Sequence, residues 1–284
     1  MKAQRAPDGS ILLFRPECNA ERMRNGAKRM SMRRVPEDVF IRAVKDTVAA
    51  NADHVPPHGK GSLYLRPLLM GTGAILGLGP APEYTFVVFC APVGSYFKGG
   101  QLTPIDLLVE ERYHRSAPRG MGGTKAAGNY SPVLVTQLDA KKQGYADVLY
   151  LDAKHDRYLE EVASCNIFVV RGRTITTPPT SGSILPGVTR RSIIELARDR
   201  GYEVVEAPVS IEEALEADEV FTTGTAVVVA SVGSITYQGK RKDYCPGGEP
   251  GAATQEMYDA LTGIQTRKVE DPHGWIVPVW EAAE

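Results

Sequence analysis

One lysine stands out because of the residues around it. Lys125 lies in residues 122–130, which read Gly-Gly-Thr-Lys-Ala-Ala-Gly-Asn-Tyr. A lysine amine that is held close to a carbonyl compound can attack it and form a Schiff base. The glycines on both sides allow the backbone to approach a bound molecule closely. The sequence therefore makes Lys125 a candidate nucleophile, and the alternative is a solvated lysine in a surface loop.

Three later segments carry groups that suit a phosphorylated molecule. Glu161 begins the run Glu-Val-Ala-Ser-Cys-Asn-Ile-Phe, and Thr189 follows Leu-Pro-Gly-Val at residues 185–188. We expect a helix to begin near Thr189, and the free N–H groups of a helix N-terminus favour a phosphate. Thr225 follows Gly224, which opens the backbone beside the threonine. Taken singly, Glu161 is also compatible with a surface carboxylate and Thr189 with a simple helix cap.

Glu160 and Glu161 are adjacent in a segment that we expect to be extended. Successive side chains of a strand point to opposite faces. We therefore expect one of the two carboxylates to face inward and the other to be solvated.

In this order the segments resemble the pyridoxal-phosphate enzymes of fold type IV, and most closely the branched-chain amino-acid aminotransferases. Lys-x-x-Gly-Asn-Tyr matches the family's Schiff-base motif, and Glu-x-x-Ser/Thr-x-Asn-hydrophobic-Phe matches a second family pattern. The resemblance implies a Schiff base on Lys125, a bond from Tyr130 to the phenolate oxygen of the cofactor, and Glu161 at its ring nitrogen. It extends over essentially the whole chain, from Leu13 to Trp275.

The same resemblance implies the remaining contacts. The catalytic residue is Lys125. The implied cofactor-binding residues are Arg22, Lys125, Tyr130, Glu161, Ser164, Val188, Thr189, Gly224 and Thr225. The implied substrate-binding residues are Tyr64, Arg66, Tyr96, Thr225 and Ala226. No metal ligand is implied.

Substrate recognition rests on a pair of residues two positions apart. In a strand, Tyr64 and Arg66 share one face, and in the family the matching arginine takes the side-chain carboxylate of glutamate. The function implied is transfer of the amino group of leucine, isoleucine or valine to 2-oxoglutarate. D-amino-acid aminotransferase and aminodeoxychorismate lyase share the fold and are alternatives.

A second class of function is a non-catalytic, truncated paralogue that acts as an interaction partner. Family members normally carry several dozen residues ahead of the position of Met1. The competent side chains at the main cofactor positions favour the enzyme. The redox Cys-x-x-Cys of mammalian members is replaced by Ala-Val-Val-Val at residues 226–229, so we expect no thiol switch there.

The composition bears on which classes of molecule the chain could bind. The chain has 284 residues, a formal net charge of −1, 43% hydrophobic and 24% charged residues. These values are typical of a globular protein and give no electrostatic argument for nucleic acid or an anionic membrane. Four distant cysteines exclude a Cys-x-x-Cys pair. We expect small-molecule substrates, a homodimer as in the family, and a cytoplasmic location, or an organelle if a natural N-terminal extension precedes Met1.

The expected fold class is α/β (α+β) with two domains. Residues 1–98 form a small α/β domain with mainly antiparallel strands, residues 99–104 a linker, and residues 105–284 a larger cofactor-binding domain with a mixed-sheet pseudo-barrel. The linker is placed at Lys98-Gly99-Gly100, because glycines permit a flexible crossing. The helices are expected near residues 22–30, 36–50, 132–143 (with Ser131 as N-cap), 189–200, 211–217 and 252–266.

Overall fold

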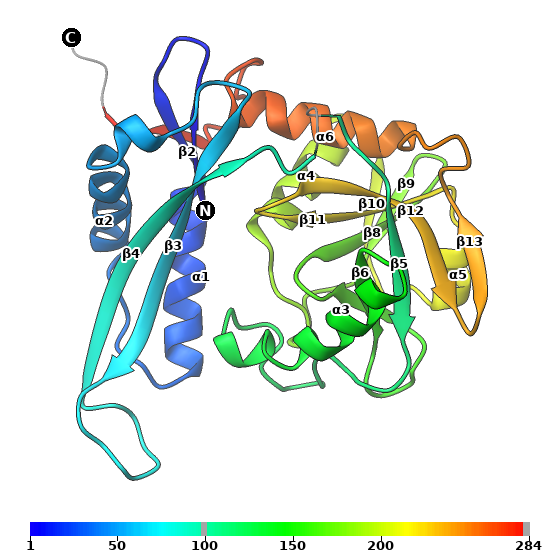
Figure 1. Ribbon diagram of the computed structural model, residues 1–284, viewed down its shortest axis with the longest axis horizontal. Coiled ribbons are helices and arrows are strands. Elements are labelled where there is room, and N and C mark those ends of the chain that lie inside the picture. The colour runs from blue at the N-terminus through cyan, green and yellow to red at the C-terminus, as the bar shows by residue number, and fades with distance from the viewer. Residues whose placement is uncertain (98–100, 281–284) are drawn as a thin grey trace. The chain divides into compact units, whose positions relative to one another are not determined.

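The computed structural model describes residues 1–97 and 101–280 (Figure 1). The described residues divide into two compact units. The first takes in residues 1–97 and 262–280, and the second takes in residues 101–261. Each unit has its own sheet and its own buried core. The Lys98-Gly99-Gly100 motif expected at the boundary lies outside the described residues.

The first unit is built on a five-stranded antiparallel sheet with the order β14-β2-β1-β3-β4. Its strands are β1 (Lys2–Arg5), β2 (Ile11–Phe14), β3 (Gly61–Thr72), β4 (Glu83–Gly94) and β14 (Ile276–Pro278). Gly9 has a φ of 86° in the turn between β1 and β2, a conformation that glycine adopts without strain. The long β3–β4 hairpin pairs Gly61 with Gly94 and Thr72 with Glu83.

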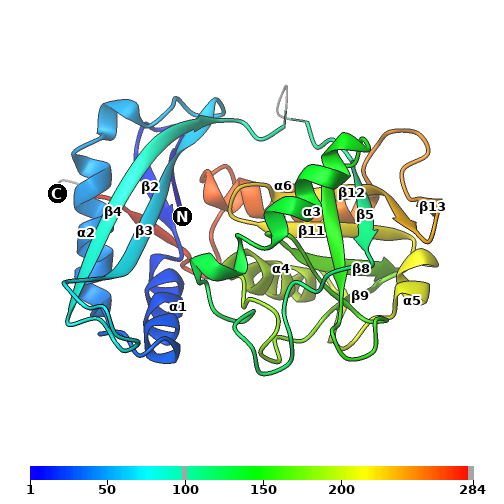
Figure 2. The same ribbon diagram turned by 60° about the horizontal axis from the view of Figure 1, so that its bottom comes forward.

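Two helices belong to this unit, α1 (Pro16–Arg29) and α2 (Glu37–Ala49). α2 buries Phe40, Val44 and Val48, which lie on one face at helical spacing. The Phe40 ring stacks on Phe86 of β4 with centroids 5.8 Å apart, so α2 is held against the sheet. Figure 2 shows both helices running alongside β3 and β4.

α1 begins at Pro16, six residues before the start expected from the sequence at Arg22. The fixed φ of proline suits the first turn of a helix, and Pro16 with Glu17 is the signal that would have located this start. The prediction missed it because the first turns of α1 carry few large apolar residues.

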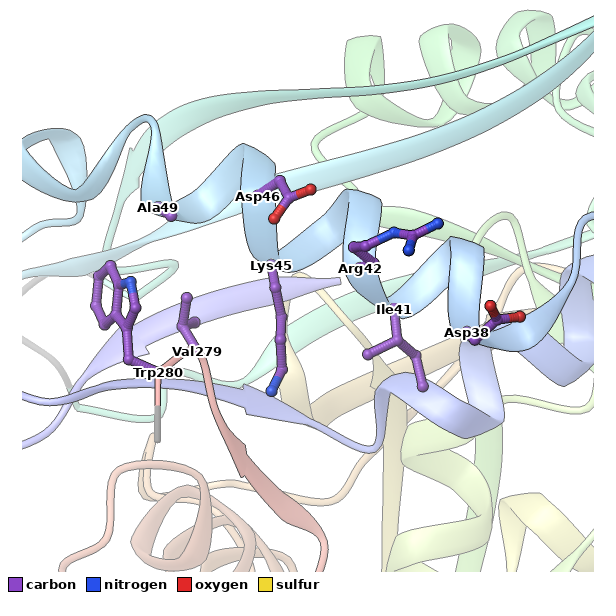
Figure 3. Close-up of a pocket in the computed structure, with 8 residues that line it drawn as sticks. All are labelled: Asp38, Ile41, Arg42, Lys45, Asp46, Ala49, Val279 and Trp280. Carbon is purple, nitrogen blue, oxygen red and sulfur yellow. The ribbon is translucent and has the colours of Figure 1, made fainter. Parts of the chain in front are cut away.

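A groove runs along the outer face of α2 and the C-terminal segment (Figure 3). It is lined by Asp38, Ile41, Arg42, Lys45, Asp46, Ala49, Val279 and Trp280. None of the candidate site residues lines it, and its polar rim carries both signs of charge.

The second unit contains a nine-stranded mixed sheet. Its strands are β5 (Ile105–Glu110), β6 (Asp147–Leu151), β7 (Leu159–Val162), β8 (Asn166–Arg171), β9 (Thr174–Thr177), β10 (Glu203–Glu206), β11 (Glu219–Gly224), β12 (Val228–Tyr237) and β13 (Lys240–Asp243). The strand order is β10-β9-β8-β11-β12-β5-β6-β7, and β7 also pairs with β8. This extra pairing closes β8, β11, β12, β5, β6 and β7 into a ring. The mixed α/β fold class and the pseudo-barrel expected from the sequence are confirmed.

The closed sheet is filled with aliphatic side chains, because its strands are covered on both faces. Leu107, Leu149, Ile167 and Val232 are fully buried in this core. The helices of the unit are α3 (Val133–Lys142), α4 (Val188–Asp199) and α5 (Ile211–Leu215), and α6 (Ala252–Gln265) runs from this unit into residues of the first. Within residues 1–97 and 101–280 no helix is both long and apolar enough to cross a membrane.

Two details of the second half differ from the sequence prediction. Ser131 does not cap α3 with its side chain; Pro132 is the N-cap residue, and the Leu134 N–H donates to the backbone carbonyl of Ser131 at 3.3 Å. The short 3-10 helix η3 (Ala127–Asn129) precedes α3, and the backbone carbonyl of Ser131 accepts where its hydroxyl was expected to. Residues 262–280, expected in the large domain, belong to the first unit because β14 pairs with β2.

Candidate active site

The lysine loop, residues 116–130, is closed by its own polar groups. The Asn129 amide donates to the carbonyls of Met121 and Thr124, both at 2.7 Å. This brings the two halves of the loop together and presents Lys125, which is exposed, beside Tyr130. Lys125 Nζ donates to Tyr130 Oη at 2.7 Å. Two residues of the Gly-Asn-Tyr sequence thus act within the loop: Asn129 holds its shape and Tyr130 orients the Lys125 amine.

The lysine loop is docked on the segment that precedes α4. Gly123 N–H donates to the carbonyl of Gly182 at 2.9 Å. A Cβ at Gly122 would collide with the carbonyl of Ser183 and with Ser116 Oγ, which accepts the Gly122 N–H at 3.1 Å. Only glycine fits this close approach. The position of Lys125 therefore depends on contacts between segments about 60 residues apart in the chain.

Glu161 lies on β7 with an exposed fraction of 2%. Arg115 Nη1 lies 2.5 Å from Glu161 Oε2, and both side chains are buried. The Asn166 amide donates to Glu161 Oε1 at 2.8 Å across the β7–β8 pairing. Oε1 thus accepts a hydrogen bond, and Oε2 lies in a buried ion pair with Arg115.

Burial raises the pKa of Glu161 to about 7. The Arg115 guanidinium opposes this effect most strongly, and a backbone hydrogen bond at Leu185 and the Lys125 ammonium also lower the pKa of Glu161. Glu161 is therefore a carboxyl group whose ionisation is balanced near neutral pH by burial and by two nearby cations. Such balance is typical of functional sites, although structural ion pairs also produce it.

The expectation that one of the two adjacent glutamates is solvated is wrong. Glu160 is 5% exposed and Glu161 is 2% exposed. β7 belongs to the closed sheet and is buried along its whole length, so opposite faces of this strand are both covered. Burial raises the pKa of Glu160, and a hydrogen bond with the Ser183 side chain opposes the rise.

Asn166 connects Glu161 to the start of α4. Its amide also donates to the carbonyl of Leu185 at 2.9 Å. A Cβ at Gly187 would collide with Asn166 Oδ1, so the loop passes directly against this side chain. α4 then begins at Val188, with Thr189 buried in its first turn and its first N–H groups without helical partners. The expected helix N-terminus at Thr189 is confirmed to within one residue.

The turn between β11 and β12 lies beside the β7–β8 turn that carries Ser164. A Cβ at Gly224 would lie 2.7 Å from Cys165 Sγ. Thr225 and Ala226 occupy the turn itself, and Ala226 is exposed. Val228 closes the turn with a φ of 63°, which is strained for a β-branched residue. Thr225 and Ser164 are thus carried on two neighbouring turns.

The remaining predicted residues belong to the first unit. Arg22 lies on α1, where Nη2 donates to Asn19 Oδ1 at 3.1 Å. Tyr64 and Arg66 share one face of β3, with the Arg66 guanidinium carbon 5.5 Å from the centre of the Tyr64 ring. Tyr96 is 58% exposed and its ring contacts Phe97.

Sequence reasoning missed Arg115 and Asn166 as site residues. Asn166 was visible as the last polar position of the Glu-x-x-Ser/Thr-x-Asn pattern. Arg115 has no signal in the sequence, because its partner Glu161 is 46 residues away. The Cys, His, Asp and Glu side chains of residues 1–97 and 101–280 form no cluster suited to a metal ion.

Residues 4–235 match the family model of amino-transferase class IV. The chain belongs to the class IV aminotransferases. It is 58% identical over 98% of its length to branched-chain amino acid aminotransferase 2, chloroplastic, of Humulus lupulus, and it covers 67% of that relative. The chain therefore spans about two thirds of the length of the curated relatives it matches.

Solved structures of branched-chain aminotransferases are also similar to this chain. The branched-chain amino acid aminotransferase of Escherichia coli is similar with a TM-score of 0.84 at 29% identity, covering 99% of this chain and 88% of that one. The branched-chain aminotransferase of Thermoproteus uzoniensis, solved with norvaline, has a TM-score of 0.83 at 26% identity, covering 98% and 88%. The recognised family and the fold type are confirmed. The enzymatic class is that of the branched-chain amino-acid aminotransferases, and the reaction is transamination of branched-chain amino acids.

Proposed function

We propose that this chain moves the amino group of leucine, isoleucine or valine to 2-oxoglutarate with pyridoxal 5′-phosphate bound at Lys125. The observation that carries the proposal is the convergence of five segments of the second unit on one another. The lysine loop docks on residues 182–183, Asn166 joins Glu161 to the start of α4, and Gly224 packs on Cys165.

The donor set fits this cofactor. A phosphate suits the first turn of α4 with Thr189 and Val188, supported by the hydroxyls of Thr225 and Ser164. The Glu161 carboxylate suits a protonated ring nitrogen, and Tyr130 suits a phenolate oxygen. By the resemblance to the family, Arg22 is a further candidate partner for the phosphate. When bound, pyridoxal phosphate supplies an electron-withdrawing ring that stabilises the carbanion left when the substrate Cα loses its proton.

The residues of the chain then have distinct roles. Lys125 would hold the cofactor covalently and, once the substrate has displaced it, would carry a proton between the substrate Cα and C4′ of the cofactor. Tyr130 orients the Lys125 amine through the 2.7 Å hydrogen bond. By the resemblance to the family, Arg66 is the candidate partner for the side-chain carboxylate of glutamate, and Tyr64 and Tyr96 are candidate aromatic contacts of the substrate. The backbone at Thr225 and Ala226 binds the α-carboxylate.

Replacing Lys125 tests the covalent role directly. Lys125→Ala should abolish the cofactor adduct that borohydride traps on the protein and should lower turnover at least a thousandfold. The matched control is Lys142→Ala, which removes an exposed lysine paired with Asp139 and should leave both unchanged. An adduct that persists in Lys125→Ala would sink the assignment.

The two-substrate requirement has its own test. Purified protein with added pyridoxal phosphate should show a visible band that bleaches with L-leucine and returns with 2-oxoglutarate. A bound band that ignores leucine would assign the chain a different amino donor. Absence of any band would favour the non-catalytic alternative, and activity on D-amino acids would favour the D-amino-acid branch.

We also propose that the chain forms a homodimer. Large apolar side chains are exposed along the β3–β4 hairpin and on α3, and such surfaces are typical of interaction sites. For location, the chloroplastic name of the Humulus lupulus relative favours an organelle over the cytoplasm expected from the sequence. Immunolocalisation of the native protein distinguishes the two.

A further inference from the structure

Arg115 is a buried arginine that lies outside the motifs identified in the sequence. It lies between β5 and the glycine-rich part of the lysine loop, and its side chain is 2% exposed. An arginine at this depth is costly unless it is paired. Its partner is Glu161, 2.5 Å from Nη1, and its Nε also donates to the carbonyl of Ala163 at 3.4 Å.

Two side chains, Arg115 and Asn166, contact the two oxygens of the Glu161 carboxylate. Arg115 takes Oε2 and Asn166 takes Oε1, while the Ala163 carbonyl holds the guanidinium in the β7–β8 turn. A carboxylate oxygen accepts more than one hydrogen bond, so lone pairs remain for a further donor. Turning the carboxylate would weaken the ion pair with Arg115 or the hydrogen bond from Asn166.

We propose that Arg115 is a positioning residue for the aminotransferase reaction, acting through Glu161 by keeping its carboxylate ionised and fixed in orientation. The inference rests on the proposed function, in which Glu161 serves the ring nitrogen of pyridoxal phosphate. Arg115 acts on Glu161 rather than on the substrate.

The charged groups around Glu161 explain why an arginine is needed here. Glu160 is adjacent on the same strand and disfavours a second negative charge, as burial itself does. Lys125 on the lysine loop acts in the opposite direction. Cys165 in the β7–β8 turn has its own pKa raised to about 12, chiefly by burial, so it adds no charge near neutral pH. Arg115 is therefore the closest fixed cation to the carboxylate among the groups that act on it.

The first test needs no turnover. Infrared spectra of the full chain, with and without pyridoxal phosphate, follow the protonated carboxyl band as the pH changes, and Glu161→Gln identifies the contribution of Glu161. In the cofactor-free chain Arg115→Met should shift this titration upward by at least one pH unit, a tenfold weaker acid. Arg115→Lys should restore part of the shift.

The matched control removes an arginine–glutamate pair outside the site. Arg112 pairs with Glu110 at 3.0 Å, with the Arg112 side chain 59% exposed. Arg112→Met should leave the Glu161 titration unchanged. An unshifted Glu161 titration in Arg115→Met would overturn the proposal.

The second test asks whether Arg115 acts through Glu161. Arg115→Met should lower kcat at least tenfold in the wild-type background and less than twofold in the Glu161→Gln background. An equal loss in both backgrounds would overturn the positioning role. The double variant also removes both buried charges together, so it folds where a single unpaired charge prevents folding.

The two tests separate this proposal from the proposed function. If no adduct forms at Lys125 in the wild-type chain, the proposed function fails. The infrared titration still decides in that case whether Arg115 holds Glu161 ionised.

Discussion

At the scale of single residues, Lys125 and Glu161 are each held by hydrogen bonds or an ion pair with neighbouring side chains. Asn129 holds the loop of Lys125, Tyr130 holds its amine, and Arg115 and Asn166 hold Glu161. The groups proposed to meet the cofactor are therefore positioned before it binds. Such preorganisation lowers the entropic cost of assembling a reactive geometry.

Glu161 should impose a pH dependence on stability. A carboxyl with a higher pKa when folded binds more protons in the folded state, so the free energy of unfolding falls as the pH rises. The fall spans the range from the ordinary value of 4.5 to about 7. In the cofactor-free chain Glu161→Gln should remove about 3 kcal/mol of this fall, measured by urea unfolding at pH 4 and pH 8.

The control for this measurement is Glu249→Gln, which changes an exposed carboxyl in the β13–α6 connection. It should retain the wild-type dependence. A wild-type fall that survives in Glu161→Gln would show that another group, such as Glu160, carries it.

At the scale of elements, glycines set how closely the site segments approach. Gly122, Gly187 and Gly224 each face a neighbour that a Cβ would meet. These three contacts join the lysine loop, the start of α4 and the β11–β12 turn to the closed sheet. The loops that carry the site residues are therefore held in place by these close approaches.

Gly122→Ala should displace the lysine loop. The new Cβ would meet the backbone carbonyl of Ser183, which cannot move as a flexible side chain would. Overpacking of this kind typically costs about 1–3 kcal/mol. We expect cofactor affinity to fall at least tenfold, measured by titration of the visible band. Gly247→Ala faces open space within the same unit and should bind as the wild type does; equal affinities of the two variants would contradict the docking role.

At the scale of the whole molecule, the β3–β4 hairpin exposes apolar side chains that an isolated chain would leave in water. Leu76 and Leu78 near its tip are fully exposed, and Leu68, Met70 and Phe89 are partly exposed along its strands. Burying one leucine contributes about 1.5–3 kcal/mol. A second copy of the chain is the occupant that we propose.

The dimer should weaken when this hairpin is made polar. Leu76→Ser with Leu78→Ser should raise the dimer dissociation constant at least tenfold in sedimentation equilibrium. Met30→Ser changes an exposed apolar residue outside the hairpin and serves as the control. A wild-type chain that sediments as a monomer at micromolar concentration would contradict the homodimer.

The sequence by itself determined the family and the local shapes. Spacing such as Lys-x-x-Gly-Asn-Tyr reflects contacts within a few residues, as the Asn129 bonds to Met121 and Thr124 show. The apolar stripe of α2 follows from local periodicity, and the helix start at Val188 follows from the Pro186-Gly187 pair before it. These features depend on neighbours in the chain, so a linear pattern records them.

Only the tertiary structure decided what lies next to these motifs. Arg115, which follows β5, meets Glu161 of β7 although 46 residues separate them, and Glu160 is buried because β7 is covered on both faces. β14 pairs with β2 although some 260 residues separate them. Such contacts depend on closure of the sheet and on long-range strand pairing, and neither leaves a period or a spacing in the sequence.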